Sequence, residues 1–306
     1  MPAPCWPKAL GRSVLRTIIH PGPVAAQRLS AIAGDPVTLR FTLEPGATVD
    51  EAIAKGFSDA GCEGGFVMFD NGRFEPFRYV MPALSSDASH AAWYSATFEP
   101  VGTVLMRNGC AIVGRRDDRP FIHCHGLWDT SEGRRMGHML APETRVAEPV
   151  AVTGIGLKGA TFDSLEDPET NFRLFEPARV GDEDPSFLEN PVLLARVRPN
   201  QDISRAVEEI CSAHGIEAAD VYGIGSLNEV RFADGRRVDS LATEVLIHEG
   251  RMERTSGQPV ARLDVAVVDV EGGIYEGQLT RGDNPVLVTF ELVIRASAPE
   301  GARREE

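Results

Sequence analysis

Two stretches of the chain show the same succession of hydrophobic and polar positions. In the first, an apolar run over residues 37–43 precedes an amphipathic stretch over 49–61 and a second apolar run over 64–69. The second stretch has its matching segments at residues 192–197, 203–215 and 221–227. Short apolar runs bounded by turn residues predict strands, and hydrophobic positions three or four residues apart predict a helix. Each stretch therefore predicts a strand, a helix and a strand.

Both expected helices carry a start signal. Thr48 and Glu51 are three residues apart, as in a capping box, in which two side chains accept hydrogen bonds from backbone N–H groups at the start of the helix. Asp202 precedes the second amphipathic stretch and has the side chain of a good N-cap residue. We therefore expect the helices to begin directly after Thr48 and Asp202.

The repetition continues toward the end of each stretch. Residues 49–61 resemble 203–215 at a spacing of 154, and residues 129–146 resemble 269–286 at a spacing of 140. The two spacings differ by 14 residues, which the first repeat must hold as an insertion; we expect it within residues 79–94. Long loops in compact domains often serve as lids or binding loops. A merely longer surface connection is the other interpretation, and both stay open.

This repeat predicts an α+β protein with two tandem domains. The region between the repeats is acidic and contains prolines, as a linker would, although its aromatic residues need burial. The expected division is an N-terminal extension at 1–36, a first domain at 37–160, an acidic linker at 161–188, a second domain at 189–297 and a tail at 298–306.

Composition narrows the class of protein. With 31 basic and 45 acidic residues the net charge is −14, so nucleic acid is an unexpected partner, because phosphate contacts need Lys and Arg. No apolar run approaches the ~20 residues that span a membrane, and the N-terminus lacks the apolar core of a signal peptide. The five cysteines are scattered and odd in number. Reduced thiols in a cytoplasmic protein are the expectation.

Three histidines carry the strongest chemical signal. His123 and His125 are two residues apart, so a strand directs both to one face and Cys124 to the other. A hairpin centred between residues 131 and 132 would place His138 directly opposite His125 and diagonal to His123. Opposed side chains lie ~5 Å apart at Cβ and diagonal ones ~7–8 Å. Three imidazoles at this spacing can hold one metal ion with a fourth position open; a structural cluster is the alternative.

The second repeat lacks these histidines. The spacing of 140 places Leu263, Val265 and Gln278 at their positions, while the turn residues Asp129, Gly133 and Gly137 return as Asp269, Gly273 and Gly277. The shared residues therefore belong to the turn. Because all three histidines disappear together, a chemical role in the first repeat is favoured over a requirement of the fold.

Several of these segments resemble the Plants and Prokaryotes Conserved (PPC or PCC) domain. They are Arg119–His125, Gly133 and Gly137–Leu140 in the first repeat, and Gly223–Leu227 and Gly277–Leu279 in the second. The resemblance implies a bacterial-type protein in which each domain packs a mixed or antiparallel sheet against a helix, and it implies a homo-oligomer, a trimer. It also implies a metal, often zinc, on His123, His125 and His138. The Arg-Gly-Arg-Pro AT-hook of plant DNA-binding members is not in the sequence.

Two hypotheses of function follow. In the first, zinc at the three histidines supports hydrolase-type or lyase-type chemistry on a small molecule, for example one that bears a carboxylate. The candidate substrate-binding residues are His20, Arg78, Tyr79, Tyr94 and Arg135, and Arg78 or Arg135 could clamp the carboxylate. Packing and turn roles would also explain these residues. In the second, the chain is a non-enzymatic, DNA-associated, regulatory or scaffolding protein. We rank the first hypothesis above the second, and no catalytic residue is assigned.

Overall fold

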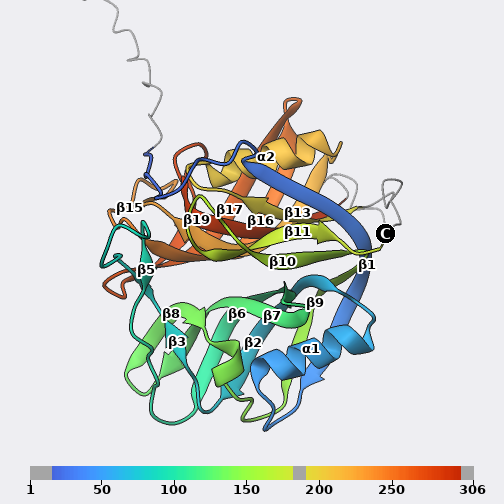
Figure 1. The fold of residues 1–306 in the computed structure, drawn as a ribbon, viewed down its shortest axis with the longest axis vertical. Helices are drawn as coiled ribbons and strands as arrows, with labels where there is room; N and C mark the ends of the chain where they lie inside the picture. Colours follow the sequence, from blue (N-terminus) through green and yellow to red (C-terminus); the bar gives the residue numbers. More distant parts are fainter. Residues whose placement is uncertain (1–15, 182–190, 298–306) are drawn as a thin grey trace, which may run out of the picture.

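The computed structural model describes residues 16–181 and 191–297 and contains two large sheets, one in each half of the molecule, with their faces toward each other (Figure 1). We call residues 29–158 the first repeat and residues 192–296 the second repeat. The first repeat consists of β1 (Leu29–Leu43), α1 (Val49–Asp59), β2 (Gly64–Phe74), β6 (Val104–Arg116), β7 (Arg119–Thr130), β8 (Gly133–Met139) and β9 (Val150–Lys158). The second consists of β12 (Val192–Val197), α2 (Ile203–Ala213), β13 (Ala218–Leu227), β16 (Thr243–Thr255), β17 (Gln258–Asp269), β18 (Ile274–Gln278) and β19 (Val286–Ala296).

Short elements fill the connections. They are β3 (Tyr79–Val80), β4 (Pro82–Ala83), β5 (Trp93–Tyr94), the 3-10 turn η1 (Ala141–Glu143), β14 (Val230–Arg231) and β15 (Arg237–Val238). The hairpin of β10 (Ala160–Glu166) and β11 (Arg173–Arg179) follows the first repeat. None of the described helices has the length and apolar character needed to cross a membrane.

Strand order confirms that the chain repeats itself. The first repeat has the order β1-β9-β2-β6-β7-β8, and the second has the matching order β12-β19-β13-β16-β17-β18. Both expected helix starts are correct: Thr48 and Glu51 form the capping box, and Asp202 accepts a hydrogen bond from the Arg205 backbone N–H. Each helix covers one face of its own sheet, and a further apolar cluster packs between the two sheets.

A single strand joins the two sheets. Residues 29–34 of β1 pair with β12 of the second repeat, whereas residues 35–43 pair with β9 of the first. In Figure 1 this long strand runs along one side of both halves. The sequence pattern predicted only the part from residue 37, because residues 29–36 combine polar positions with Gly34 and Pro36. Part of the expected N-terminal extension is therefore strand.

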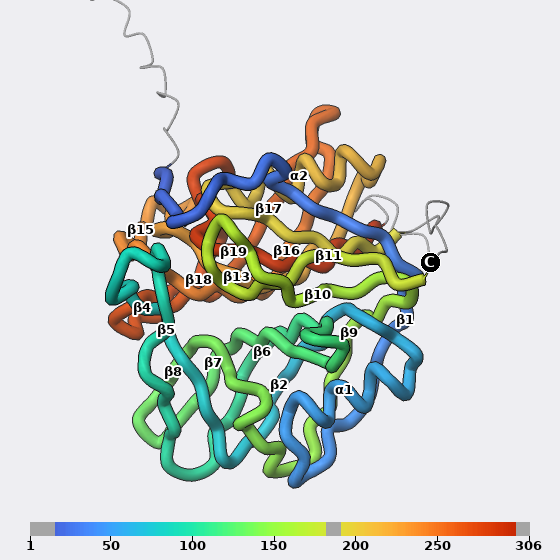
Figure 2. The backbone as a smooth tube through the Cα atoms, in the orientation of Figure 1, coloured from blue at the N-terminus to red at the C-terminus, as the bar shows by residue number. Residues whose placement is uncertain are grey.

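The expected acidic linker contains the β10–β11 hairpin, which lies between the two halves in Figure 2. Its Asp167 is buried and forms ion pairs of 2.5 Å with both Arg196 and Arg198 of the second repeat. On the other side, Asp163 pairs in parallel with Arg115 of β6. The hairpin thus contacts both repeats. Residues 182–188 of the expected linker lie outside the described residues, as do 1–15 and 298–306.

The insertion in the first repeat is confirmed. Between Phe74 of β2 and Val104 of β6 there are 29 residues, against 15 between Leu227 of β13 and Thr243 of β16, a difference of 14. The added length carries the small β4–β5 pair, which reaches from the first half toward the second (Figure 2).

One expectation about the second repeat is wrong. Gly126 pairs with Gly137 in the first hairpin, but Val265 pairs with Gly277 in the second, so the second turn holds one residue more. A slip of one residue exchanges the two faces of a strand. Leu263 and Val265 consequently pack in the core beneath α2, on the face that Cys124 occupies beneath α1 in the first repeat.

The true counterparts of the histidines follow from this pairing. Asp264 lies opposite Gln278, as His125 lies opposite His138, and Arg262 takes the place of His123. The second repeat therefore still lacks all three histidines, but polar residues replace them rather than aliphatic ones.

Candidate metal centre between the two repeats

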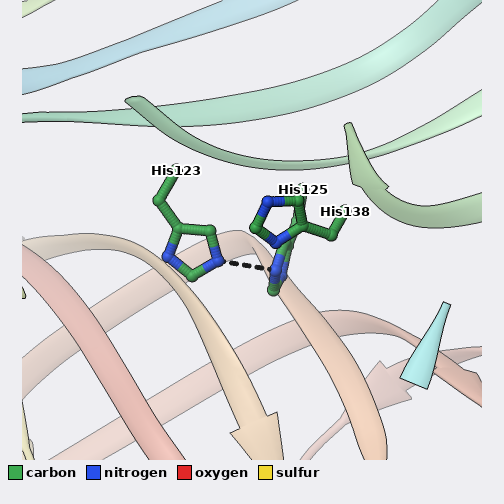
Figure 3. A group of neighbouring side chains, drawn as sticks. All are labelled: His123, His125 and His138. Carbon is green, nitrogen blue, oxygen red and sulfur yellow. Dashed lines mark hydrogen bonds between the residues drawn. The ribbon is translucent and has the colours of Figure 1, made fainter. Parts of the chain in front are cut away.

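The three predicted histidines meet in the interior of the molecule (Figure 3). His123 and His125 come from β7 and His138 from β8; the two-residue turn between these strands places His125 directly opposite His138, as expected. One ring nitrogen from each lies within 4.8 Å of the others. His125 is fully buried, and Cys124 faces the opposite side of the strand.

Local sequence explains how β8 is held. A Cβ at Gly137 would lie 2.4 Å from the carbonyl oxygen of Val80, so only glycine allows β3 to approach β8 this closely. Val80 of β3 then pairs with His138. The Gly-His pair in the sequence therefore combines a close backbone approach with a candidate ligand.

The second repeat contributes two carboxylates to this cluster. Glu244 of β16 places Oε2 2.5 Å from Nε2 of His125, and Glu291 of β19 places Oε2 3.1 Å from Nδ1 of His123. Both glutamates are buried. The cluster is thus built from both halves of the chain, with imidazoles on one side and carboxylates on the other.

Hydrogen bonds determine which nitrogens face the centre. His125 donates its Nδ1–H to the carbonyl oxygen of Val245 at 2.9 Å, and Nδ1 of His123 forms a hydrogen bond with the Glu291 carboxyl group. Both rings therefore direct Nε2 inward, and these two atoms are 2.9 Å apart. Partners of this kind orient metal-binding histidines in proteins.

The third ring has a free nitrogen. Nδ1 of His138 is buried and has no hydrogen-bond partner, and a buried polar atom without a partner costs about 1–3 kcal/mol. A metal ion would satisfy this lone pair together with the inward nitrogens of His123 and His125. Three neutral imidazoles are a common donor set for zinc and other first-row divalent ions. The residues present therefore fit a metal ion.

Burial and mutual repulsion keep two of the rings neutral. Burial, with the neighbouring His125, lowers the pKa of His123 to about 3, and burial lowers the pKa of His138 well below its usual value. Burial would also lower the pKa of His125, but the Glu244 carboxylate outweighs it and raises that pKa. Burial raises the pKa of Glu291 to about 7. Neutral imidazole is the form that binds metal.

A small pocket of about 50 Å³ opens beside the cluster. Its lining includes His123 and Glu244, but most of it is aromatic or aliphatic, with Trp93, Tyr94 and Phe172 as its largest side chains. No Lys or Arg is among the lining residues. The pocket therefore suits a small, largely apolar group.

The insertion and the β10–β11 turn form one side of this pocket, and residues of the second repeat form much of the rest. Trp93 belongs to the insertion and Phe172 to the β10–β11 turn, and their rings stack with centroids 5.2 Å apart. The Asn171 side chain also donates a hydrogen bond to the Ser89 carbonyl oxygen. Tyr94 packs edge-on against His138 at 5.4 Å. The insertion is therefore connected to the histidine cluster by ring contacts.

Of the other predicted substrate-binding residues, only Tyr94 lines the pocket. His20 is buried behind it and donates Nε2–H to the carbonyl oxygen of Leu287, a lining residue. Tyr79 packs in the core of the first repeat against Trp128. Arg78 forms exposed ion pairs with Glu99 and Glu143, and Arg135 lies near Glu132 in the hairpin turn. Neither arginine reaches the pocket, so the expected carboxylate clamp is not formed by them.

Sequence reasoning missed both glutamates. A signal was present, because Glu291 is the single charged residue in the mostly apolar run Val286–Ile294, and Glu244 lies directly before the apolar residues 245–247. Buried charges are rare unless they are paired. An isolated acid in a buried strand could therefore have been proposed as a site residue, although not as a partner of the histidines.

Fold and site together define an α+β protein of two tandem sheets with a buried histidine cluster between them. Residues 188–298 match the model of the Plants and Prokaryotes Conserved (PCC) domain. The second repeat therefore matches the PCC domain along its length, in agreement with the resemblance, and the first repeat has the same strand order. No protein of curated function matches the chain.

Solved structures of similar proteins match about half of the chain or less. A metal-containing protein from Archaeoglobus fulgidus is 17% identical and covers 49% of this chain and 99% of its own, with a TM-score of 0.38. A PPC protein from Pyrococcus horikoshii is 15% identical and covers 52% and 100%, with a TM-score of 0.37. A protein from Bacteroides thetaiotaomicron that is named as a proposed DNA-binding protein is 17% identical and covers 35% and 79%, with a TM-score of 0.31.

Proposed function

We propose that this chain binds a divalent metal ion, with zinc as the first candidate, at His123, His125 and His138. The observation that supports the proposal most strongly is the convergence of the three imidazoles in a buried cluster. The free Nδ1 of His138 supports it further. A divalent ion would also compensate the negative charge that Glu244 brings into the interior.

We further propose that the pocket beside the ion admits a small molecule. A bound divalent ion supplies Lewis-acid chemistry there, of the kind used by hydrolases and lyases. The apolar lining supports a ligand whose body is uncharged. Without Lys or Arg in the lining, a carboxylate on the ligand would find no cationic side chain and would lie beside Glu244. The pocket therefore favours a ligand without a carboxylate.

Metal analysis of the full chain, purified without a histidine tag, tests the first proposal. The wild type should contain about one equivalent of metal, and His125→Ala should contain almost none. His248→Ala is a matched control, because His248 lies on β16 of the second repeat outside the cluster. Equal metal content in all three proteins, or none in the wild type, would contradict the proposal.

The same preparations distinguish the second hypothesis. A DNA-associated protein should bind duplex DNA at physiological salt with an affinity that falls steeply as salt increases. The net charge of −14 does not favour that outcome. DNA binding that is unaffected by His125→Ala would replace the small-molecule proposal with a nucleic-acid one.

A further inference from the structure

The carboxylate of Glu244 occupies a position that differs from that of Glu291. Glu291 contacts the outward nitrogen of its histidine, Nδ1 of His123. Glu244 contacts the inward nitrogen, Nε2 of His125, at 2.5 Å. Glu244 is therefore on the side of the rings where an ion would lie, and Glu291 is on the side away from it.

Nε2 of His125 has two close neighbours that both need a proton to form a hydrogen bond, but it can carry only one. This nitrogen faces Glu244 Oε2 at 2.5 Å and His123 Nε2 at 2.9 Å. Ionised carboxylates only accept hydrogen bonds, and an imidazole nitrogen carries at most one proton. When His123 donates through Nδ1, its Nε2 is an acceptor as well. One proton on His125 cannot serve both neighbours, whereas a cation placed between the three atoms would attract all of them.

We propose that Glu244 is a fourth protein ligand of the ion, so that the second repeat completes the metal centre of the first. This inference rests on the proposed metal binding. Glu244 comes from β16, whereas the histidines come from β7 and β8, so the ion would connect the two sheets directly. Glu244 also lines the pocket. With four protein ligands, a zinc ion would have to expand to five ligands for a molecule in the pocket to reach it.

The test compares Glu244→Gln with the wild type in the full chain. Gln keeps the size of the side chain but removes its charge, so Zn²⁺ affinity, measured by competition with a chromogenic chelator, should fall by at least about tenfold. The visible spectrum of the Co²⁺-loaded protein should change because the ligand set changes. Glu249→Gln is the matched control, since Glu249 lies on the same strand but is exposed and paired with Arg251. It should leave affinity and spectrum unchanged.

A crystal structure of the Zn²⁺-loaded wild type gives a reading that does not depend on any variant. A Glu244 oxygen should lie about 2.0–2.2 Å from the ion. If the wild type binds Zn²⁺ but this distance exceeds about 3 Å, or if Glu244→Gln matches the wild type in affinity and spectrum, the inference is overturned while the proposed function survives. A wild type that binds no metal would overturn both.

Discussion

In the first repeat, β7 carries His123 and His125 on the face that lies toward the other sheet. In the second repeat, the matching strand β17 carries Arg262 and Asp264. The first set is buried beneath the other half of the molecule. The second set lines an open polar hollow of about 240 Å³ with Arg251 and other charged residues. The same fold thus presents one covered face and one uncovered face.

The two repeats supply different groups to the same site. The first supplies the imidazoles, whereas the second supplies Glu244, Glu291 and the Val245 carbonyl oxygen that orient or approach them. The second repeat, which lacks the histidines, thus makes a different contribution to the same centre. Five predictions, ordered from the largest expected effect to the smallest, test this division and the contacts around it.

The hairpin partners give the largest expected contrast. His138→Ala should lower Zn²⁺ affinity by more than about 100-fold, since it removes a ligand and not just an orienting group. Gln278→Ala alters the matching position of the second repeat and should have no effect on affinity. Chelator competition on the full chain measures both. A comparable loss in Gln278→Ala would mean that the second repeat also holds an ion.

The ion pairs of the β10–β11 hairpin should contribute strongly to stability. Asp167→Asn removes the buried carboxylate that Arg196 and Arg198 share and leaves both guanidinium groups with Glu176 alone. The cost should be about 3 kcal/mol, the lower end of the range for breaking a buried pair. Urea unfolding at pH 7 measures the change. Leu165→Ala, an exposed position on the same hairpin, serves as control and should change stability by less than about 0.5 kcal/mol.

The pH dependence of the same pair has a definite sign. Burial would raise the pKa of Asp167, but Arg196 outweighs it and lowers the pKa from 3.8 to about 2. A carboxylate with a depressed pKa stabilises the folded state above its unfolded pKa and loses that contribution as the pH falls. The wild type should therefore lose stability between pH 4 and 2 more steeply than Asp167→Asn. If the stabilities of the two proteins fall equally with pH, the ionisation of Asp167 does not contribute to the pH dependence of folding.

The register of β17 predicts a smaller contrast between neighbouring residues. Val265→His places an imidazole in the apolar core beneath α2 and should destabilise the fold by about 2–4 kcal/mol. Asp264→His places it in the polar hollow and should change stability by less than about 0.5 kcal/mol. Thermal unfolding of both variants measures the difference. The opposite ranking would restore the pairing expected from sequence spacing alone.

The aromatic cover should have the smallest effect. Phe172→Ala opens the stack with Trp93 above the pocket, so EDTA should remove Zn²⁺ severalfold faster while the equilibrium affinity stays close to that of the wild type. Leu165→Ala again serves as control. A change in affinity without a change in rate would mean that Phe172 supports the ligands rather than covering them.

Local signals in the sequence predicted the first hairpin well. A short Asp/Gly turn between His125 and His138 fixed the pairing, and the caps at Thr48 and Asp202 fixed both helix starts. The pairing expected for the second hairpin is wrong by one residue, because similar residues at equal spacing do not show how many residues the turn contains. This error moved Val265 to the wrong face.

The carboxylates could not be found in the same way. Glu244 and Glu291 meet the histidines only through the packing of the two repeats, across more than 100 residues of chain. Periodicity and spacing describe one element at a time and carry no information about which faces meet. The arginines at 78 and 135 were misplaced for the same reason, since sequence could not show which loops approach the site.

Strand β1 has a consequence for how the molecule could ever come apart. Separating the two halves would break the pairing between residues 29–34 and β12, and it would expose the edge of β12 to solvent. Exposed edges of this kind invite pairing with other chains. Neither half should therefore fold well when it is expressed alone, and the molecule should unfold in a single cooperative step.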